Sequence, residues 1–373
     1  MRSHSVPIGV PKTRDSRDGP QVQHPNNRPP IVDVDTSQDP RRLARRRLTE
    51  EILEQDEPVS PVLRDALLNE DEQWVVALRE GPEKNYVFVR SPPDVVEADV
   101  YCGEYQGKKV ALKRLRIFQM IEPSRKGALK RAFYRESLIW QGLNHECVLP
   151  FYGISEDVFE GALCMVSPWS ETGNVREFLK EVREGGSIVG QDYLDMIHPW
   201  LLQVAMGLQY LHGIDLSHGD VRGPNVLVGE DGKVRLSDFG LAAISEEGGS
   251  YFSCQGGPWG WIAPELIDPE AFNLNSSVPT RASDVYSFGC LCVEFYTGTS
   301  PFAGMSQGQT LGKILKGVKP ERPTYPGGRM EDNVWTTISQ CWKRDWRERP
   351  SIDKVVEFFW TIQPVSPHSH LVA

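Results

Sequence analysis

Hydrophobic and polar positions along the chain change from a strand-like spacing to a helix-like spacing. Short runs of β-branched and aromatic residues predict three strands, near residues 86–89, 98–101 and 109–113. Beyond residue 190, apolar residues recur three or four positions apart and form one helical face that ends at Leu211. Strand-rich sequence therefore precedes a longer, helix-rich region.

A further helix, predicted over residues 126–143, carries a carboxylate in its apolar face. That face is formed by Leu129, Phe133, Trp140 and Leu143. Glu136 lies in the middle of this stripe, and a buried, unpaired charge is costly, so we expect a cation beside it. Lys113 is the leading candidate because it alternates with apolar residues on its predicted strand. The alternative is that Glu136 lies at a helix edge and pairs with nothing.

The N-terminal region reads differently from the rest of the chain. Residues 1–38 are rich in Pro, Asn, Asp, Ser and Arg, and they are predicted to be a disordered arm. Residues 39–80 are predicted to be a helical extension that packs on the following domain or recruits a protein partner. The basic run at 41–47 is either a solvated helix face or a nuclear-import or anion-binding patch.

Composition limits the possible functions and compartments. The 373 residues carry a formal net charge of −10, which argues against general nucleic-acid binding. Seven cysteines without a C-x-x-C pair predict neither a disulfide framework nor a zinc site. No apolar signal core or run of about 18 apolar residues is present, so no membrane association is expected. We expect a cytoplasmic protein, with nuclear import left open by the basic run.

The stretch HGDVRGPNVLVGEDGKVRLSDFG at residues 218–240 concentrates the candidate chemistry. Two β-type runs, at 226–228 and 234–236, flank the turn residues Glu-Asp-Gly and predict a hairpin. The hairpin brings the loops at its two ends together. Those loops carry Asp220, Asn225 and Asp238. One such Asp alone could be a turn cap, but three metal-facing or base-type side chains favour phosphoryl transfer from a nucleotide.

The spacing D-x-x-x-x-N, followed after one hairpin by D-F-G, resembles the catalytic and metal-binding loops of the protein-kinase family. The run V-A-L-K at residues 110–113 resembles the strand lysine of that family. The resemblance covers roughly residues 86–362. It implies an α+β, two-lobed protein-kinase-like fold, with a small antiparallel β-sheet lobe with one key helix at about 86–168 and a larger, mainly helical lobe at about 171–362. Residues 363–373 would be a C-terminal tail.

The resemblance implies a role for each site residue. Asp220 would accept the proton of a substrate hydroxyl, Lys113 would contact the nucleotide phosphates and pair with Glu136, and Arg222 would touch the γ-phosphate. Asn225 and Asp238 would hold Mg²⁺. The remaining positions expected to contact ATP are Val100, Ala111, Ser167, Pro168 and Trp169. The implied cofactors are ATP and Mg²⁺, and the implied substrate is a protein hydroxyl.

Features farther along the chain agree with this resemblance. Glu265, in A-P-E, is the expected ion-pair partner of Arg349. Asp284 opens an apolar run like the buried kinase helix that anchors the catalytic loop. Cys341-Trp342, followed by Arg349-Pro350, looks like the tyrosine-kinase-like branch.

The chain departs from the family pattern at the glycine-rich loop. Its three glycine positions fall on Pro93, Val95 and Ala98, whose side chains prevent close approach of the backbone to phosphates. Each lost amide bond to a phosphate costs roughly 1.5–3 kcal/mol. A pseudokinase scaffold with weak or no nucleotide binding is therefore the alternative to an active enzyme. Gly219 also replaces the usual Arg, which predicts that activity does not need phosphorylation of the activation segment.

Substrate choice rests on three positions. Arg222 stands where serine/threonine kinases usually have Lys, whereas Pro258 looks more like the tyrosine-kinase sequence. Pro224, where tyrosine kinases would have Arg, opposes a tyrosine assignment. We favour serine/threonine. A further reading makes the N-terminal arm the active part and the domain its platform.

Overall fold

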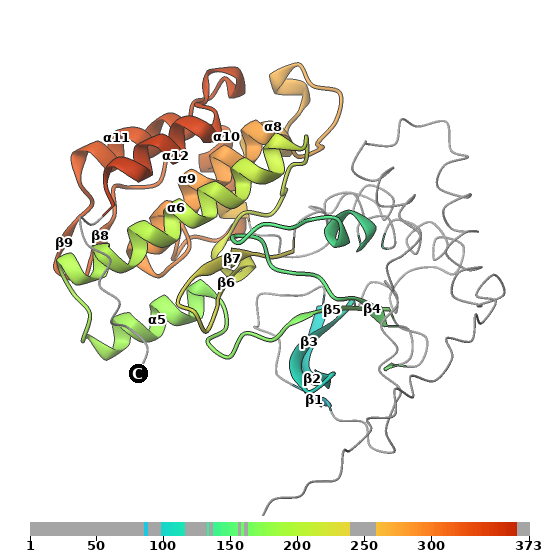
Figure 1. Ribbon diagram of the computed structural model, residues 1–373. Coiled ribbons are helices and arrows are strands. Elements are labelled where there is room, and N and C mark those ends of the chain that lie inside the picture. The colour runs from blue at the N-terminus through green and yellow to red at the C-terminus, as the bar shows by residue number, and fades with distance from the viewer. Residues whose placement is uncertain are drawn as a thin grey trace, which may run out of the picture. The chain divides into compact units, whose positions relative to one another are not determined.

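The computed structural model describes residues 86–88, 98–115, 133, 137–155, 158–159, 163–238 and 259–363 (Figure 1). Some of the sequence predictions fall on residues outside these ranges. Those residues belong to the N-terminal arm, the helical extension, the loop at 89–97 and the C-terminal tail, and they include Glu136 and Pro258.

A five-stranded antiparallel sheet forms the small lobe, with the strand order β1-β2-β3-β5-β4. Its strands are β1 (Tyr86–Phe88), β2 (Ala98–Tyr105), β3 (Lys108–Leu115), β4 (Gly153–Ser155) and β5 (Cys164–Pro168). On β3, Val110 and Leu112 are buried while Ala111 and Lys113 are partly exposed, because successive side chains of a strand point to opposite faces. The three predicted strands and this alternation are confirmed.

The predicted helix around Trp140 is confirmed in its described part, but it ends earlier than predicted. Residues 137–141 are helical, whereas Leu143 lies beyond the helix. The last turn tightens, since the Leu143 N–H donates to the Trp140 carbonyl at 3.1 Å, and Gly142 favours the helix end. Phe133, Trp140 and Leu143 are nevertheless buried, as the apolar stripe predicts.

Helices make up most of the large lobe. They are α5 (Val175–Gly185), α6 (Gln191–Gly213), α8 (Pro264–Ile267), α9 (Arg281–Thr297), α10 (Gln307–Leu315), α11 (Asp332–Cys341) and α12 (Ile352–Thr361). Short 3₁₀ turns are η3 (Gly223–Asn225), η4 (Trp259–Trp261), η5 (Glu270–Phe272) and η6 (Trp346–Glu348). Two small hairpins complete it: β6 (Val226–Val228) with β7 (Val234–Leu236), and β8 (Thr324–Tyr325) with β9 (Gly328–Arg329).

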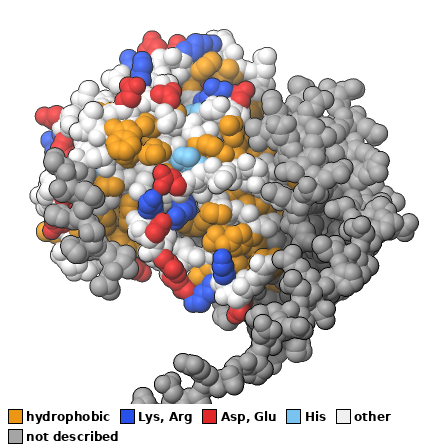
Figure 2. All heavy atoms as spheres, in the orientation of Figure 1, with side chains coloured by type: hydrophobic (Ala, Val, Ile, Leu, Met, Phe, Trp, Pro, Cys, Tyr) orange, Lys and Arg blue, Asp and Glu red, His pale blue; other side chains and the backbone are white. Residues whose placement is uncertain are grey.

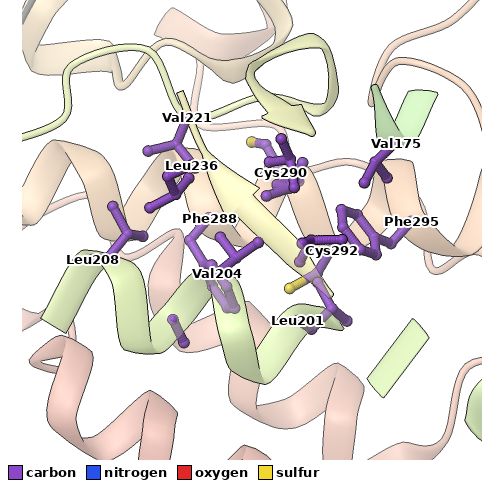
Figure 3. Close-up of a cluster of buried hydrophobic side chains, with 14 of the residues drawn as sticks. Val175, Leu201, Val204, Leu208, Val221, Leu236, Phe288, Cys290, Cys292 and Phe295 are labelled. Carbon is purple, nitrogen blue, oxygen red and sulfur yellow. The ribbon is translucent and has the colours of Figure 1, made fainter. Parts of the chain in front are cut away.

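Helix α9 is the central element of the large lobe, because its middle is buried on all sides. A capping box between Thr280 and Ser283 begins the helix, and Gly298 at φ 67° ends it. Side chains of α5, α6, α9, β7 and the segment between α6 and η3 pack together in the core (Figure 3). The labelled members are Val175, Leu201, Val204, Leu208, Val221, Leu236, Phe288, Cys290, Cys292 and Phe295.

The hairpin β6–β7 confirms the sequence prediction, and it is fixed to both lobes. Leu236 donates its N–H to the Cys147 carbonyl at 2.9 Å and accepts from the Leu149 N–H at 2.8 Å. On the other side, β7 packs on α6. The two loops at the ends of this hairpin are therefore held firmly at the junction of the small sheet and the helices.

The surface of the described part carries charges of both signs. On the face drawn in Figure 2, basic and acidic side chains alternate with apolar ones. Among the described residues, no helix combines the length and apolar character needed to cross a bilayer.

Candidate active site

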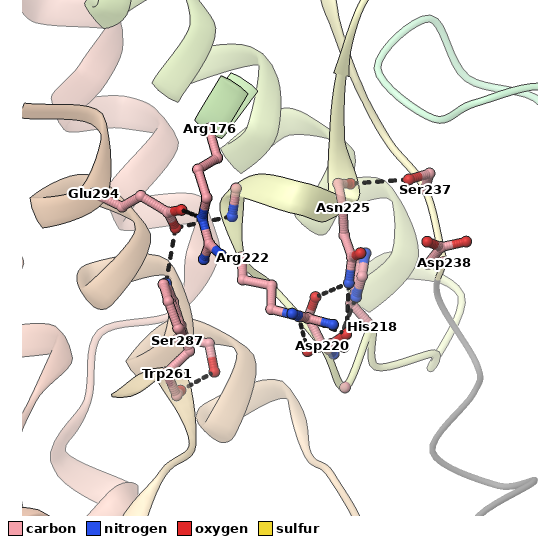
Figure 4. A network of polar contacts seen from close by, with 12 residues as sticks. Arg176, His218, Asp220, Arg222, Asn225, Ser237, Asp238, Trp261, Ser287 and Glu294 are labelled. Carbon is pink, nitrogen blue, oxygen red and sulfur yellow. Dashed lines mark hydrogen bonds and ion pairs between the residues drawn. The ribbon is translucent and has the colours of Figure 1, made fainter. Parts of the chain in front are cut away.

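Asp220 lies within residues 218–225, the segment that the sequence makes the candidate catalytic loop. Its two carboxylate oxygens each accept from the Arg222 Nε at 2.9 Å, and Oδ2 also accepts from the Asn225 Nδ2 at 2.6 Å (Figure 4). The same Asn225 amide nitrogen donates to the Asp220 carbonyl at 2.8 Å. These charge-assisted bonds fix the direction of the Asp220 carboxylate.

Helix α9 anchors the loop just before Asp220. The Asp284 carboxylate accepts from the backbone N–H of His218 at 2.7 Å and from that of Gly219 at 2.9 Å. It also contacts the His212 Nε2 at 2.9 Å. The anchoring role that the resemblance implies for Asp284 matches these contacts. Gly219 has a φ of 83°, a backbone conformation that favours glycine.

His218 supports the loop as a neutral imidazole. Complete burial lowers its pKa, although the nearby carboxylates of Asp284, Asp220 and Asp238 act in the opposite direction. Its Nδ1 accepts the backbone N–H of Asp220 at 3.2 Å, so the ring proton resides on Nε2. The imidazole thus holds the Asp220 backbone without adding a charge to the site.

Asp238 follows β7 and lies next to the catalytic loop. Ser237 donates its N–H to the Asn225 carbonyl at 2.9 Å and its hydroxyl to the same oxygen at 3.2 Å. Asp238 itself has a φ of 61°, which is uncommon for a residue with a Cβ, although Asp adopts it more readily than most residues. The structure therefore brings Asn225 and Asp238 together, as the hairpin predicts.

Lys113 joins the small sheet to this group. Its Nζ lies 2.7 Å from the Asp238 Oδ1, and the two side chains are 13% and 21% exposed. The contact links β3 to the loop after β7. Sequence reasoning proposed Glu136 as the partner of Lys113, and Glu136 lies outside the described residues.

The other positions expected to contact ATP lie along β2, β3 and β5. Val100 is the register partner of Lys113, and Ala111 is that of Ser167. Ser167 is buried and Pro168 ends β5.

The connector that follows β5 is tied to both lobes. The Trp169 N–H donates to the Lys109 carbonyl at 3.2 Å, and an ion pair joins Lys109 to Glu171. The hydrogen bond from Lys109 lowers the pKa of Glu171. Ser170 donates its hydroxyl to the Val228 carbonyl of β6 at 2.6 Å. These bonds fix the connector between the sheet and the catalytic loop.

The oxygen donors at Asn225 and Asp238 fit a magnesium ion. Both Asn225 bonds to Asp220 use the amide nitrogen, so neither bond occupies the amide oxygen, which could serve as a ligand together with the Asp238 carboxylate. Mg²⁺ prefers such oxygen ligands and completes its shell with waters and phosphates. Among the described residues, no group of three or more His, Cys, Asp or Glu could hold a metal ion. The donor set therefore suits a metal shared with a nucleotide more than a metal held by protein alone.

The predicted ion pair between Glu265 and Arg349 is confirmed. The guanidinium donates from Nη1 to Oε1 at 2.5 Å and from Nη2 to Oε2 at 2.7 Å, and both side chains are buried. This parallel arrangement of two bonds is the strong geometry for an Arg–carboxylate pair.

Sequence reasoning did not identify a second polar cluster, formed by Arg176, Trp261 and Glu294 (Figure 4). One signal was available. Glu294 is an isolated carboxylate inside the apolar run FGCLCVEFY, and a buried charge requires partners.

A family model described as protein tyrosine and serine/threonine kinase matches residues 94–359. The match covers more than half of the chain. It includes every site residue described above.

Proposed function

Because the chain belongs to the protein tyrosine and serine/threonine kinase family, we propose that it transfers the γ-phosphoryl group of ATP to serine or threonine hydroxyls of proteins. The convergence of Lys113, Asp238, Asn225 and Asp220 is the observation that supports this proposal. A cation from the small sheet pairs with the carboxylate that follows the hairpin, while Asn225 and Asp220 lie together on the segment that precedes it. Such an arrangement suits a polyphosphate with its metal on one side and a hydroxyl nucleophile on the other.

In the proposed reaction, the substrate hydroxyl oxygen forms a bond to the γ-phosphorus as the bond from that phosphorus to the β–γ bridging oxygen breaks. The hydroxyl proton passes to the Asp220 carboxylate, and ADP leaves. Arg222 lies against that carboxylate and would place a positive charge beside the transferred phosphoryl group. Lys113 would hold the phosphates. A bound Mg²⁺, held by Asn225 and Asp238, would neutralise the charge of the phosphate oxygens.

We further assign the enzyme to serine/threonine substrates and to the tyrosine-kinase-like branch. Arg222 supports the first assignment, because a cation two residues after the base is usual in serine/threonine enzymes. Pro224, in the position where a tyrosine kinase would carry Arg, points the same way. Cys341-Trp342 with Arg349-Pro350 supports the branch.

A pseudokinase scaffold is the second candidate. Its support is the sequence from the loop after β1 to the start of β2, where Pro93, Val95 and Ala98 replace glycines. The direct contact between Lys113 and Asp238 also satisfies both charges without a nucleotide. In this reading the helical extension at 39–80 recruits a protein partner.

Phosphate transfer from ATP and Mg²⁺ to generic protein substrates separates the two candidates. We expect wild-type transfer that is lost in both Asp220→Asn and Lys113→Ala, since the first removes the proton acceptor and the second removes a phosphate contact. Wild-type transfer no greater than that of these variants would favour the scaffold. Phosphoamino-acid analysis of the product then tests the serine/threonine assignment, and phosphotyrosine would contradict it.

Nucleotide binding is tested separately by thermal stabilisation. A ligand that binds only the folded state raises its melting temperature by mass action. We expect ATP with Mg²⁺ to stabilise the wild-type protein more than ATP with EDTA, and Asp238→Asn to remove that difference. If ATP raised the melting temperature equally with Mg²⁺ and with EDTA, the assignment of Asn225 and Asp238 to magnesium would be contradicted.

A further inference from the structure

The small sheet has an apolar outer face, which carries Tyr101, Val110, Leu112 and Val166. Tyr101, Leu112 and Val166 are register partners across β2, β3 and β5, and cross-strand partners share a face. Val110 lies two residues before Leu112 and therefore on the same face, whereas Lys113 lies on the opposite one. All four apolar side chains are buried. One face of the sheet thus carries the lysine of the candidate active site, and the other carries a small hydrophobic core.

This small core is separate from the core of the large lobe. In the described part of the chain it consists of Tyr101, Val110, Leu112, Val158 and Val166, with Tyr105, Tyr152 and Phe159 packed against it. Val158 and Phe159 follow β4, so no helix or second sheet of the described residues belongs to the cluster. A sheet buries an apolar face against another layer of secondary structure. The described residues therefore supply a loop, but not a layer, over the outer face.

A cation with an unused donor lies at one end of the outer face. Arg114 follows Leu112 by two positions and donates from Nη2 to the Asp99 Oδ2 at 2.6 Å. Its Cζ lies 5.4 Å from the centre of the Tyr101 ring and 5.0 Å from that of the Phe159 ring. The Nε of Arg114 is buried and has no hydrogen-bond partner among the described residues. Because an unsatisfied buried donor of a charged group is costly, this position favours a further acceptor, and a carboxylate is the strongest one.

The sequence before β1 places a carboxylate inside an apolar stripe. Residues 60–78 lie outside the described part of the chain, and their sequence SPVLRDALLNEDEQWVVAL predicts a helix that begins at its Ser-Pro pair. At 100° per residue, four apolar side chains fall within about 60° of arc: Leu63, Leu67, Trp74 and Leu78. Glu70 lies about 20° beside this arc, between Leu67 and Trp74 along the chain. If the stripe is buried, Glu70 needs a cation.

The connection to β1 is short enough to place this predicted helix on the sheet. Eight peptide units separate Leu78 from Tyr86, and they span at most about 29 Å. Strand β1 lies at the edge of the sheet, and its Phe88 is the register partner of Tyr101. The helix would be about 28 Å long, and a sheet of five strands is about 19 Å wide. Residues 60–78 are therefore within reach of the outer face and long enough to cross it.

From these observations we propose that residues 60–78 dock as a helix on the outer face of the small sheet of the same chain, with Glu70 paired to the Nε of Arg114. The apolar stripe supplies the missing layer, and Glu70 supplies the missing acceptor. Docking within one chain is favoured over recruitment of a separate protein, because the short connection gives the helix a high effective concentration at the sheet. This inference does not depend on the proposed kinase activity.

Amide hydrogen exchange of the full chain tests the ionic contact. Glu70→Gln should speed exchange in the peptides of β2 and β3 by about 10- to 100-fold, because a hydrogen bond between charged groups is lost and the strands open more often. Glu72→Gln is the matched control, since Glu72 lies on the opposite side of the predicted helix, and it should leave exchange unchanged. In an Arg114→Gln background, Glu70→Gln should cause no further change, because its partner is already absent.

A second pair of variants tests the apolar contact. Trp74→Ala should also speed exchange in the peptides of β2 and β3, since it removes the largest side chain of the stripe. Trp360→Ala is its control, because Trp360 is 58% exposed on α12 in the large lobe. It should leave exchange in these peptides unchanged. Unchanged exchange in Glu70→Gln or in Trp74→Ala would overturn the inference, and residues 60–78 would then be free to recruit a separate protein.

Dilution separates docking within one chain from docking between two copies. Exchange in β2 and β3 of the purified wild-type protein should stay equally slow over about a hundredfold dilution, because an intramolecular contact does not depend on protein concentration. Protection that is lost on dilution would mean that a second copy supplies the helix, and it would overturn the inference. None of these measurements uses phosphate transfer, so an inactive protein would contradict only the kinase proposal.

Discussion

Lys113 and Asp238 meet at 2.7 Å, although they are 125 positions apart in sequence and belong to β3 and to the loop after β7. Both side chains are mostly shielded from water, so their attraction is screened less than that of a surface pair. On the proposed function, phosphates would compete for the lysine and Mg²⁺ for the aspartate. Binding of the metal–nucleotide complex would then replace one contact between opposite charges by two.

His198 offers a residue-scale prediction about pH. Burial lowers its pKa, against the opposing effect of Glu331 and Asp195, while its Nε2 lies 2.6 Å from the Tyr296 hydroxyl and its carbonyl accepts from Gln363. Below a pH of about 6.5 the unfolded chain binds a proton that the folded protein does not bind. The free energy of unfolding should therefore fall as the pH decreases below that value.

Melting temperatures between pH 7.5 and 5.5 check this expectation. His198→Gln should be less stable at pH 7.5, because it loses the contact with Tyr296, but its stability should fall less steeply with acid. One proton of difference gives a limiting slope of about 1.4 kcal/mol per pH unit. His145 and His218 also have pKa values lowered by burial, so part of the slope should remain. If stability fell as steeply with acid in the variant as in the wild-type protein, His198 would not contribute to the pH dependence of stability.

At the scale of elements, sequence predicted best what local spacing determines. The hairpin at 226–236 and the buried face of α6 follow from residues close together in the chain, and both are confirmed. The helix ending at Gln141 was predicted two residues too long, because periodicity does not show where the last turn tightens.

Contacts over long sequence distances were harder to predict. The cluster around Glu294 joins residues 33 and 118 positions apart, and no local pattern specifies its partners. The bond between Glu265 and Arg349 spans 84 positions and was predicted only because both lie in motifs of a known family. The partner of Lys113 in the described residues, Asp238, was assigned to the metal instead. A sequence identifies a buried charge that needs a partner more readily than it identifies the partner.

The same substitution should have opposite effects in two helices. Gly312, inside α10, has nothing within 4 Å of the position of an added Cβ, whereas a Cβ at Gly289 of α9 would lie 2.7 Å from the Trp342 Nε1. Gly312→Ala should stabilise the protein by about 0.5–1 kcal/mol, since alanine loses less backbone entropy in a helix. Gly289→Ala should destabilise it, because the neighbouring ring must move.

Urea unfolding of these two variants provides the measurement. The urea concentration at the unfolding midpoint should rise for Gly312→Ala and fall for Gly289→Ala. The dependence of the free energy of unfolding on urea concentration should be similar in both variants. Destabilisation by Gly312→Ala would mean that α10 has a close neighbour at this position.

At the scale of the whole molecule, Arg349 connects distant parts of the large lobe. It pairs with Glu265 at the start of α8, donates from Nη1 to the Ala282 carbonyl of α9 at 2.9 Å, and donates from Nε to the Lys343 carbonyl at 3.0 Å. Its Cζ also lies 5.0 Å from the centre of the Tyr286 ring. One guanidinium thus holds together the end of the activation segment, α9 and the loop after α11.

Loss of this arginine should therefore weaken the whole fold. Arg349→Met keeps an apolar stem of similar reach but leaves Glu265 buried without its partner, which should lower the free energy of unfolding by about 3–5 kcal/mol. Adding Glu265→Gln should recover part of that loss, because it removes the stranded charge. Arg347→Ala is the control: its guanidinium is exposed and 3.4 Å from Asp345, so it should change stability by no more than about 1 kcal/mol. Urea unfolding measures all three, and an Arg349→Met variant as stable as Arg347→Ala would show that the buried pair adds nothing to the cohesion of the lobe.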